Sequence, residues 1–186
     1  MSEKDMTVTA VILNGWNDST PQLYYPGVTK QPASVANYYG FHVATEEGYE
    51  SLRAIAAFLA DRYGRKSSPY GRVSNWVIGN EINNQQWNYM GPTDLTAYVR
   101  AYQKAFRVIY TAIKSTNAND RVYFSLDYNW MNEIDGKLKY GGKQIVDSFN
   151  SIANTEGQME WGLAYHPYPC PMTEPEFWDD PQSTGL

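Results

Sequence analysis

The sequence predicts an α/β fold in which parallel strands alternate with helices. Four short runs of β-branched and aromatic residues alternate with three longer segments whose apolar residues recur at helical spacing. Helices of this length allow right-handed crossovers between parallel strands. Polar and aromatic residues follow each predicted strand, and no such cluster precedes one. A β/α barrel builds its functional face at the carboxyl ends of its strands, so this asymmetry indicates part of a barrel.

The four predicted strands are apolar runs that stop at polar residues. They comprise Thr7–Leu13, Val73–Ile78, Arg121–Leu126 and Met159–Tyr165. A doubly wound sheet is the alternative for this order of elements, but no glycine-rich phosphate loop follows any of the runs. With 186 residues, of which 42% are hydrophobic and 19% charged, we expect one domain over residues 1–186.

Three segments have the pattern of amphipathic helices. The first begins after Thr45, whose side chain can cap it, and ends at Gly64. The second runs from about Thr93 to Lys114, and its apolar face is expected to be core. Apolar residues between positions 145 and 153 mark the third.

The connection between the first predicted strand and the first helix is unusually long. Residues 17–44 have no helical period and carry several prolines and the pairs Tyr24-Tyr25 and Tyr38-Tyr39. Structureless connections of this length are uncommon in compact domains and often bind ligands. We therefore expect a binding loop or lid.

The residues that follow the second predicted strand are the strongest candidates for chemistry. The run Val73–Ile78 stops at Gly79, and Asn80 and Glu81 come next. In a β/α barrel an amide and a carboxylate at this position face the substrate. The competing interpretation is a turn with a solvated carboxylate.

Two motifs resemble those of the clan A glycoside hydrolases, which are (β/α)8 barrels with two catalytic glutamates. They are Trp76–Glu81, which ends in Asn-Glu, and Tyr165–Tyr168, which contains His-x-Tyr. The resemblance implies that Glu81 is the general acid/base, that Asn80 contacts the sugar 2-hydroxyl, and that Tyr168 lies near the nucleophile. The second motif comes two strands after the first, as in the clan. The chain is therefore similar to the third to sixth strands of a cellulase-like barrel.

The chain departs from the clan at the second carboxylate. By the resemblance, the nucleophile is a glutamate after the seventh strand, well beyond His-x-Tyr. Glu174 and Glu176 follow His166 too closely, with no intervening helix or strand, to take that role. A whole barrel needs roughly 250 residues. We therefore expect this chain to be a fragment of a longer retaining glycoside hydrolase that acts on a poly- or oligosaccharide. The fragment by itself should have little turnover.

Other polar and aromatic residues at strand ends are candidate contacts for a carbohydrate substrate. Aromatic rings with an apolar face grip neutral polyhydroxylated ligands, although each ring can instead pack beneath a loop. The candidates are Asn14, Trp16, Trp87, Trp130, His166 and Tyr168. His42 and His166 are the only histidines, and no cluster has ligand spacing, so no metal or other cofactor is expected.

Charge and composition narrow the classes of partner. The net charge of −5 and the lack of any Lys/Arg run argue against nucleic acid or an anionic membrane. No apolar run reaches membrane length. The single cysteine, Cys170, does not reveal the compartment, and secretion is expected only if the gene encodes a signal upstream.

The competing functional class is a non-catalytic carbohydrate-binding or self-associating protein that keeps the barrel face. A half-barrel would expose two sheet edges, which favours a homo-oligomer.

Overall fold

Four parallel strands form one sheet in the order in which they occur along the chain. The computed structural model describes residues 6–131, 135–168, 173 and 176. The strands β1 (Thr9–Ile12), β2 (Asn75–Ile78), β3 (Arg121–Leu126) and β4 (Trp161–Tyr165) pair in the order β1-β2-β3-β4. All three pairings are parallel. This confirms the predicted α/β fold, although three of the four strands are shorter than the apolar runs that predicted them.

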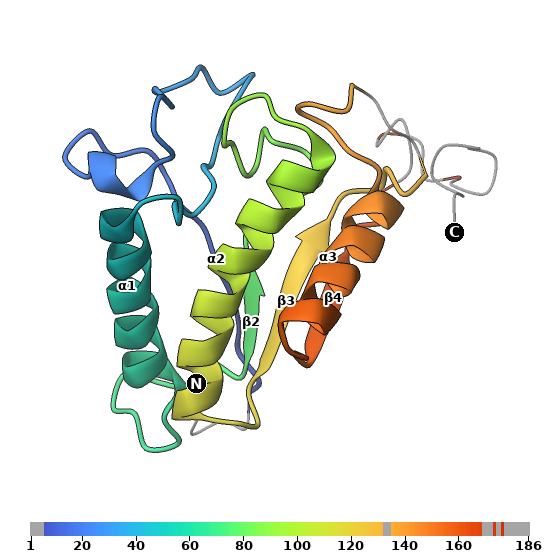
Figure 1. The fold of residues 1–186 in the computed structure, drawn as a ribbon. Coiled ribbons are helices and arrows are strands. Elements are labelled where there is room, and N and C mark those ends of the chain that lie inside the picture. The colour runs from blue at the N-terminus through green and yellow to red at the C-terminus, as the bar shows by residue number, and fades with distance from the viewer. Residues whose placement is uncertain (1–5, 132–134, 169–172, 174–175, 177–186) are drawn as a thin grey trace.

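A helix follows each of the first three strands. They are α1 (Glu46–Gly64), α2 (Leu95–Thr116) and α3 (Gly142–Glu156), and a short 3-10 turn, η2 (Pro21–Leu23), precedes α1. The three α-helices lie side by side in front of the sheet in Figure 1, and the strands run upward behind them. None of the described helices is long and apolar enough to cross a membrane.

Side-chain caps set where the first two helices begin. The Thr45 hydroxyl accepts a hydrogen bond from the Gly48 N–H, as its position predicts. The Asp94 carboxylate accepts one from the Ala97 N–H, so α2 begins at Leu95 rather than at Thr93.

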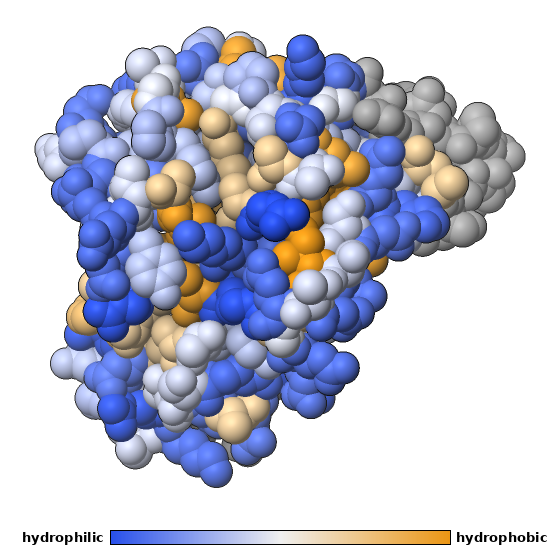
Figure 2. All heavy atoms as spheres, viewed as in Figure 1, coloured by the Kyte–Doolittle hydropathy of each residue, from blue (hydrophilic) through white to orange (hydrophobic). Residues whose placement is uncertain are grey.

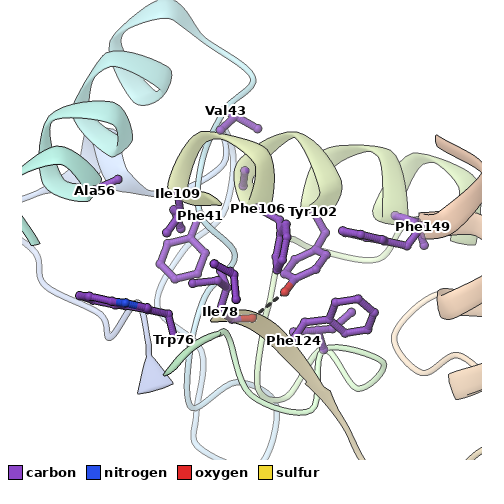
Figure 3. Close-up of a cluster of buried hydrophobic side chains, with 14 of the residues drawn as sticks. Phe41, Val43, Ala56, Trp76, Ile78, Tyr102, Phe106, Ile109, Phe124 and Phe149 are labelled. Carbon is purple, nitrogen blue, oxygen red and sulfur yellow. Dashed lines mark hydrogen bonds between the residues drawn. The ribbon is translucent and has the colours of Figure 1, made fainter. Parts of the chain in front are cut away.

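The core lies between the sheet and the helices, with α2 at its centre. Figure 3 shows Trp76 and Ile78 from β2 and Phe124 from β3 turned toward the aromatic and aliphatic side chains of α2. The predicted apolar face of α2 is confirmed. Its wholly buried members are Tyr98, Val99, Tyr102, Phe106, Ile109 and Ile113. Burying one such side chain contributes about 1.5–3 kcal/mol, so α2 holds much of the stability.

The opposite face of the sheet carries a row of residues in register. Val11, Val77, Tyr123 and Gly162 occupy one row across the four strands. A Cβ atom on Gly162 would lie 2.4 Å from the Tyr123 ring, which therefore covers this glycine. At the β1 edge Val11 is 50% exposed. In the described part of the chain, all three α-helices lie on the other face.

The surface on the helix side is largely hydrophilic. In Figure 2 the hydrophobic residues visible on this face lie mainly in the depressions between helices. Figure 1 shows the long loops after β1 and β2 gathered at the end of the sheet toward which the strands point.

The connection between β1 and α1 has little regular secondary structure, as the lack of a helical period in residues 17–44 predicts, but it is packed. It builds a small core of its own from Tyr24, Ala36 and Tyr39. The Trp16 ring stacks on Tyr24 with 4.2 Å between centroids. Aromatic rings gain both buried area and specific ring contacts when they cluster, so the tyrosines of this loop fold it onto itself.

Candidate active site

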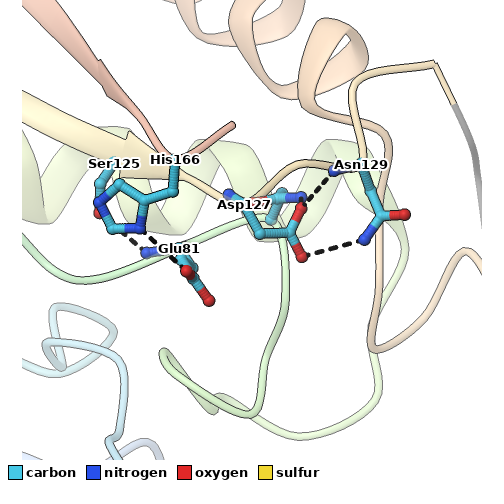
Figure 4. Close-up of polar contacts among 6 residues, drawn as sticks. Glu81, Ser125, Asp127, Asn129 and His166 are labelled. Atoms are coloured by element: carbon cyan, nitrogen blue, oxygen red, sulfur yellow. Dashed lines mark hydrogen bonds and ion pairs between the residues drawn. The ribbon is translucent and has the colours of Figure 1, made fainter. Parts of the chain in front are cut away.

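Glu81 and His166 meet at the carboxyl ends of β2 and β4. The Glu81 Oε1 atom lies 2.9 Å from His166 Nδ1, although the two residues are 85 positions apart in the chain. Their side chains are 15% and 28% exposed, respectively. With its proton on Nδ1, the imidazole donates this hydrogen bond to the carboxylate. Figure 4 shows the two side chains facing each other beside Ser125 of the intervening strand.

The backbone at Glu81 adopts a left-handed conformation. Its φ is 42°, the only positive value among the described residues other than glycine, and Gly79 has a φ of 78°. A side chain in this region costs of order 1–3 kcal/mol, so surrounding contacts must hold it. The Ser125 hydroxyl accepts from the Glu81 N–H at 2.9 Å, and the Ser125 carbonyl accepts from the Ile82 N–H at 2.9 Å. Ser125 thus fixes the turn that presents the Glu81 carboxylate.

Two buried tyrosines of α2 hold the same turn from the core side. The Tyr102 hydroxyl donates to the Ile78 carbonyl at 2.5 Å, and the Tyr98 hydroxyl donates to the Ile82 carbonyl at 2.5 Å. Both side chains are wholly buried. Burial raises the pKa of each phenol well above its ordinary value, so both remain protonated donors. The segment from Ile78 to Ile82 is therefore anchored at both ends.

Asp127 joins the loops after β2 and β3 instead of facing Glu81. Its Oδ1 atom accepts from the Asn83 side chain at 2.5 Å and from the Asn129 N–H at 2.9 Å. Its Oδ2 atom accepts from the Asn129 side chain, and the Asp127 N–H donates to Asn83 Oδ1. Figure 4 shows the carboxylate turned toward Asn129. Since Asp127 is only 4% exposed and its oxygens are occupied, its role here is structural.

The other candidates at the ends of β2 and β4 are open to solvent. Asn80 is partly buried, and its side chain makes no hydrogen bond within the described ranges. Tyr168 is 45% exposed, with its ring 5.9 Å from that of His166 in an edge-to-face arrangement. Asn80 directly precedes Glu81 in the chain, and Tyr168 lies two residues after His166.

Asn14 and two tryptophans serve local packing. The Asn14 side chain donates to the Leu23 and Gly40 carbonyls, which closes the loop after β1. Trp16 belongs to the aromatic cluster of that loop, and its indole N–H donates to Asp18. Trp130 packs edge-to-face on Tyr165 at 5.8 Å. All three side chains thus have contacts within the fold, and their assignment as carbohydrate contacts stays a prediction.

Trp87 differs from the other tryptophans because it lies beside Tyr38 on the rim formed by the loops after β1 and β2. The two ring centroids are 6.2 Å apart, with an interplanar angle of 31°. Both residues are partly exposed.

Sequence reasoning missed Ser125, Asn83 and the two tyrosine hydroxyls. A signal existed for Ser125 and for the tyrosines. Ser125 interrupts an otherwise apolar run of β3, and tyrosines replace aliphatic residues on the core face of α2. Buried polar atoms require hydrogen-bond partners, but the sequence does not say which atoms those are.

A second carboxylate does not join the pair within the part of the chain that the structure describes. Glu176 is exposed, whereas Glu174 and Cys170 lie outside the described residues. Among the described residues no group of three His, Cys, Asp or Glu side chains is arranged to hold a metal ion.

No curated protein and no solved structure matches the chain. A family of unknown function, DUF5722, matches residues 1–185. Its description assigns no chemistry to the site above. The chain belongs to the DUF5722 family.

Proposed function

We propose that this chain carries the acid/base half of a retaining glycoside hydrolase site in a (β/α)8 barrel. The observation that carries the proposal is the 2.9 Å contact between Glu81 and His166. It joins the two motifs that resemble the clan A glycoside hydrolases, and it lies at the carboxyl ends of parallel strands, where barrel enzymes bind substrate. The four strands would be half of the eight in the barrel.

The geometry of Glu81 suits a group that exchanges a proton with a substrate. Its Oε1 atom faces His166, while Oε2 has no hydrogen-bond partner among the described residues. With Oε1 oriented by the imidazole, Oε2 is free to reach the glycosidic oxygen. A protonated Glu81 would give its proton to that oxygen as the C–O bond breaks, and would later take a proton from the attacking water.

The nucleophile has to come from a second carboxylate. Retaining enzymes place it about 5 to 5.5 Å from the acid/base, where it attacks the anomeric carbon and forms a covalent glycosyl intermediate. In this proposal that group lies outside the described residues, and Asn80 uses its free amide for the sugar 2-hydroxyl beside the bond that breaks.

The test compares leaving groups in the protein encoded by the whole natural reading frame. Glu81→Ala should lose hydrolysis of glycosides with alkyl or sugar leaving groups by several orders of magnitude. It should retain the first chemical step on dinitrophenyl glycosides, because that leaving group departs without a proton. Azide should then rescue turnover by replacing the water that Glu81 would activate. Equal losses on both substrate types, or no loss on either, would refute the assigned role.

A non-catalytic carbohydrate-binding protein is the second candidate. It is favoured by the lack of a second carboxylate at the Glu81–His166 pair within the described ranges. Oligosaccharide binding without turnover, in both the whole frame and the 186-residue chain, would support it. If the protein neither hydrolyses nor binds any glycoside of a broad panel, both functions are wrong.

A further inference from the structure

Tyr38 and Trp87 form a pair of rings at the rim of the candidate active site that no structural contact requires. Both are partly exposed, and the rings lie 6.2 Å apart with an interplanar angle of 31°. Within the described ranges neither the Tyr38 hydroxyl nor the Trp87 indole N–H has a hydrogen-bond partner. The pair thus presents ring surface with unused polar atoms at its border.

The backbone beneath the pair is firmly held. The loops after β1 and β2 are joined by hydrogen bonds from the Asn37 N–H to the Gln86 carbonyl at 2.7 Å and from the Tyr89 N–H to the Tyr38 carbonyl at 2.9 Å. A third bond joins the Gly40 N–H to the Tyr89 carbonyl at 2.9 Å. The buried Tyr39 ring packs against Tyr89 below. Rings on such a scaffold lose little conformational freedom when a ligand binds.

Two consecutive turns connect Glu81 to Trp87. The Asn84 N–H donates to the Glu81 carbonyl at 2.8 Å, and the Trp87 N–H donates to the Asn84 carbonyl at 3.0 Å. Each such turn keeps its end Cα atoms within about 7 Å, so the Cα atoms of Glu81 and Trp87 lie within about 14 Å. This is within reach of a short oligosaccharide bound at Glu81.

The charges around the rings favour a neutral ligand. Neither residues 31–41 nor residues 81–92 contain Lys or Arg. Lys139 forms a backbone β-bridge with Asn84, and its N–H group donates a hydrogen bond to the Asp135 carboxylate. Burial alone would raise the pKa of Asp135. The N–H groups of Leu138, Lys137 and Lys139, together with the Lys139 charge, nevertheless hold it below its ordinary value. Lys139 thus already has a carboxylate beside it.

We propose that Tyr38 and Trp87 are a stacking platform for a pyranose ring of a neutral, β-linked oligosaccharide whose neighbouring residue lies at Glu81. The negative face of an aromatic ring attracts the weakly positive C–H groups of a sugar. When both glycosidic bonds of a pyranose are equatorial, as in β-1,4-linked chains, the ring exposes a flat C–H face suited to this contact. The proposal rests on the proposed function and adds the substrate class and the residues that select it.

The experiment measures binding to the 186-residue chain carrying Glu81→Gln, so that no turnover interferes. Calorimetry with cellotetraose, xylotetraose and mannotetraose tests the neutral β-linked class, maltotetraose the α-linked class, and a galacturonate trimer the acidic class. At least one of the three β-linked sugars should bind. Trp87→Ala and Tyr38→Ala should each weaken that affinity at least about fivefold, while Trp87→Phe retains most of it.

Tyr70→Ala is the matched control, because Tyr70 is an aromatic residue 58% exposed in the turn before β2, at the opposite end of the strand. It should leave binding unchanged, and circular dichroism should show all variants folded. Unchanged affinity in both Trp87→Ala and Tyr38→Ala would overturn the platform, as would binding of only the α-linked or acidic probe. If no probe binds, the platform is also wrong. Glu81-dependent hydrolysis by the whole protein then decides separately whether the proposed function stands.

Discussion

Removing a single buried hydroxyl should show how strongly α2 holds the Glu81 turn. Tyr102→Phe deletes the group that donates to the Ile78 carbonyl at 2.5 Å and keeps the ring. The ring contacts with Phe106, Phe124 and Phe149, all at about 6 Å between centroids, should remain. The substitution therefore isolates one hydrogen bond.

The expected cost follows from the complete burial of Tyr102. A buried carbonyl deprived of its donor costs about 1–3 kcal/mol, because water cannot reach it to replace the lost bond. In a chain of this length each kcal/mol lowers the melting temperature by about 2–4 °C. We expect a fall of about 2–12 °C, together with weaker sugar binding, because Ile78 immediately precedes the Gly79–Glu81 turn.

Urea denaturation followed by circular dichroism measures the free energy of unfolding. The matched control is Tyr49→Phe on α1, whose hydroxyl has no hydrogen bond within the described part of the chain. That variant should change stability by less than about 0.5 kcal/mol. If the two variants have the same midpoint, the Tyr102 hydroxyl does not hold the turn. A changed denaturant slope would instead indicate a change in the compactness of the unfolded or native state, or a loss of two-state unfolding.

Three further predictions concern residues away from the Glu81–His166 pair. Gly48→Ala should destabilise the protein by about 1–3 kcal/mol in the same urea assay, because the added Cβ atom would lie 2.0 Å from the buried His42 ring. The control, Ala57→Gly on the exposed side of α1, should cost only about 1 kcal/mol. Burial lowers the pKa of His42, although the charge of Glu47 opposes this shift, so the folded chain holds the imidazole neutral. The contribution of His42 to stability should therefore be complete above about pH 6.5 and decline below it. His42→Gln should remove that part of the pH profile, and an unaltered profile would contradict the assignment. Because β1 and β4 are the outer strands and Val11 is 50% exposed, the chain should self-associate in sedimentation experiments, and Val11→Lys should reduce this association. A monomer at all concentrations would count against open sheet edges.

Local patterns were sufficient to predict the elements and the position of Glu81. The alternation of apolar runs and helical periods located four strands and three helices, because both periods are properties of neighbouring residues. The Thr45 cap and the core face of α2 follow from the same short-range chemistry. Glu81 stood out because it comes, with Asn80, just after a strand that ends at a glycine.

Tertiary structure decided which side chains surround Glu81. Its contact with His166 spans 85 residues and depends on β3 lying between β2 and β4 in parallel register. The left-handed backbone at Glu81 depends on its hydrogen bond with Ser125. The position of Trp16 depends on a loop whose tyrosines pack against one another and against the indole ring. No sequence period encodes such contacts, because they arise from the register, twist and packing of elements far apart in the chain. Glu81 and His166 were therefore visible in the sequence one by one, whereas Ser125 and the two tyrosine hydroxyls were not. The folded chain alone determined which of these groups meet.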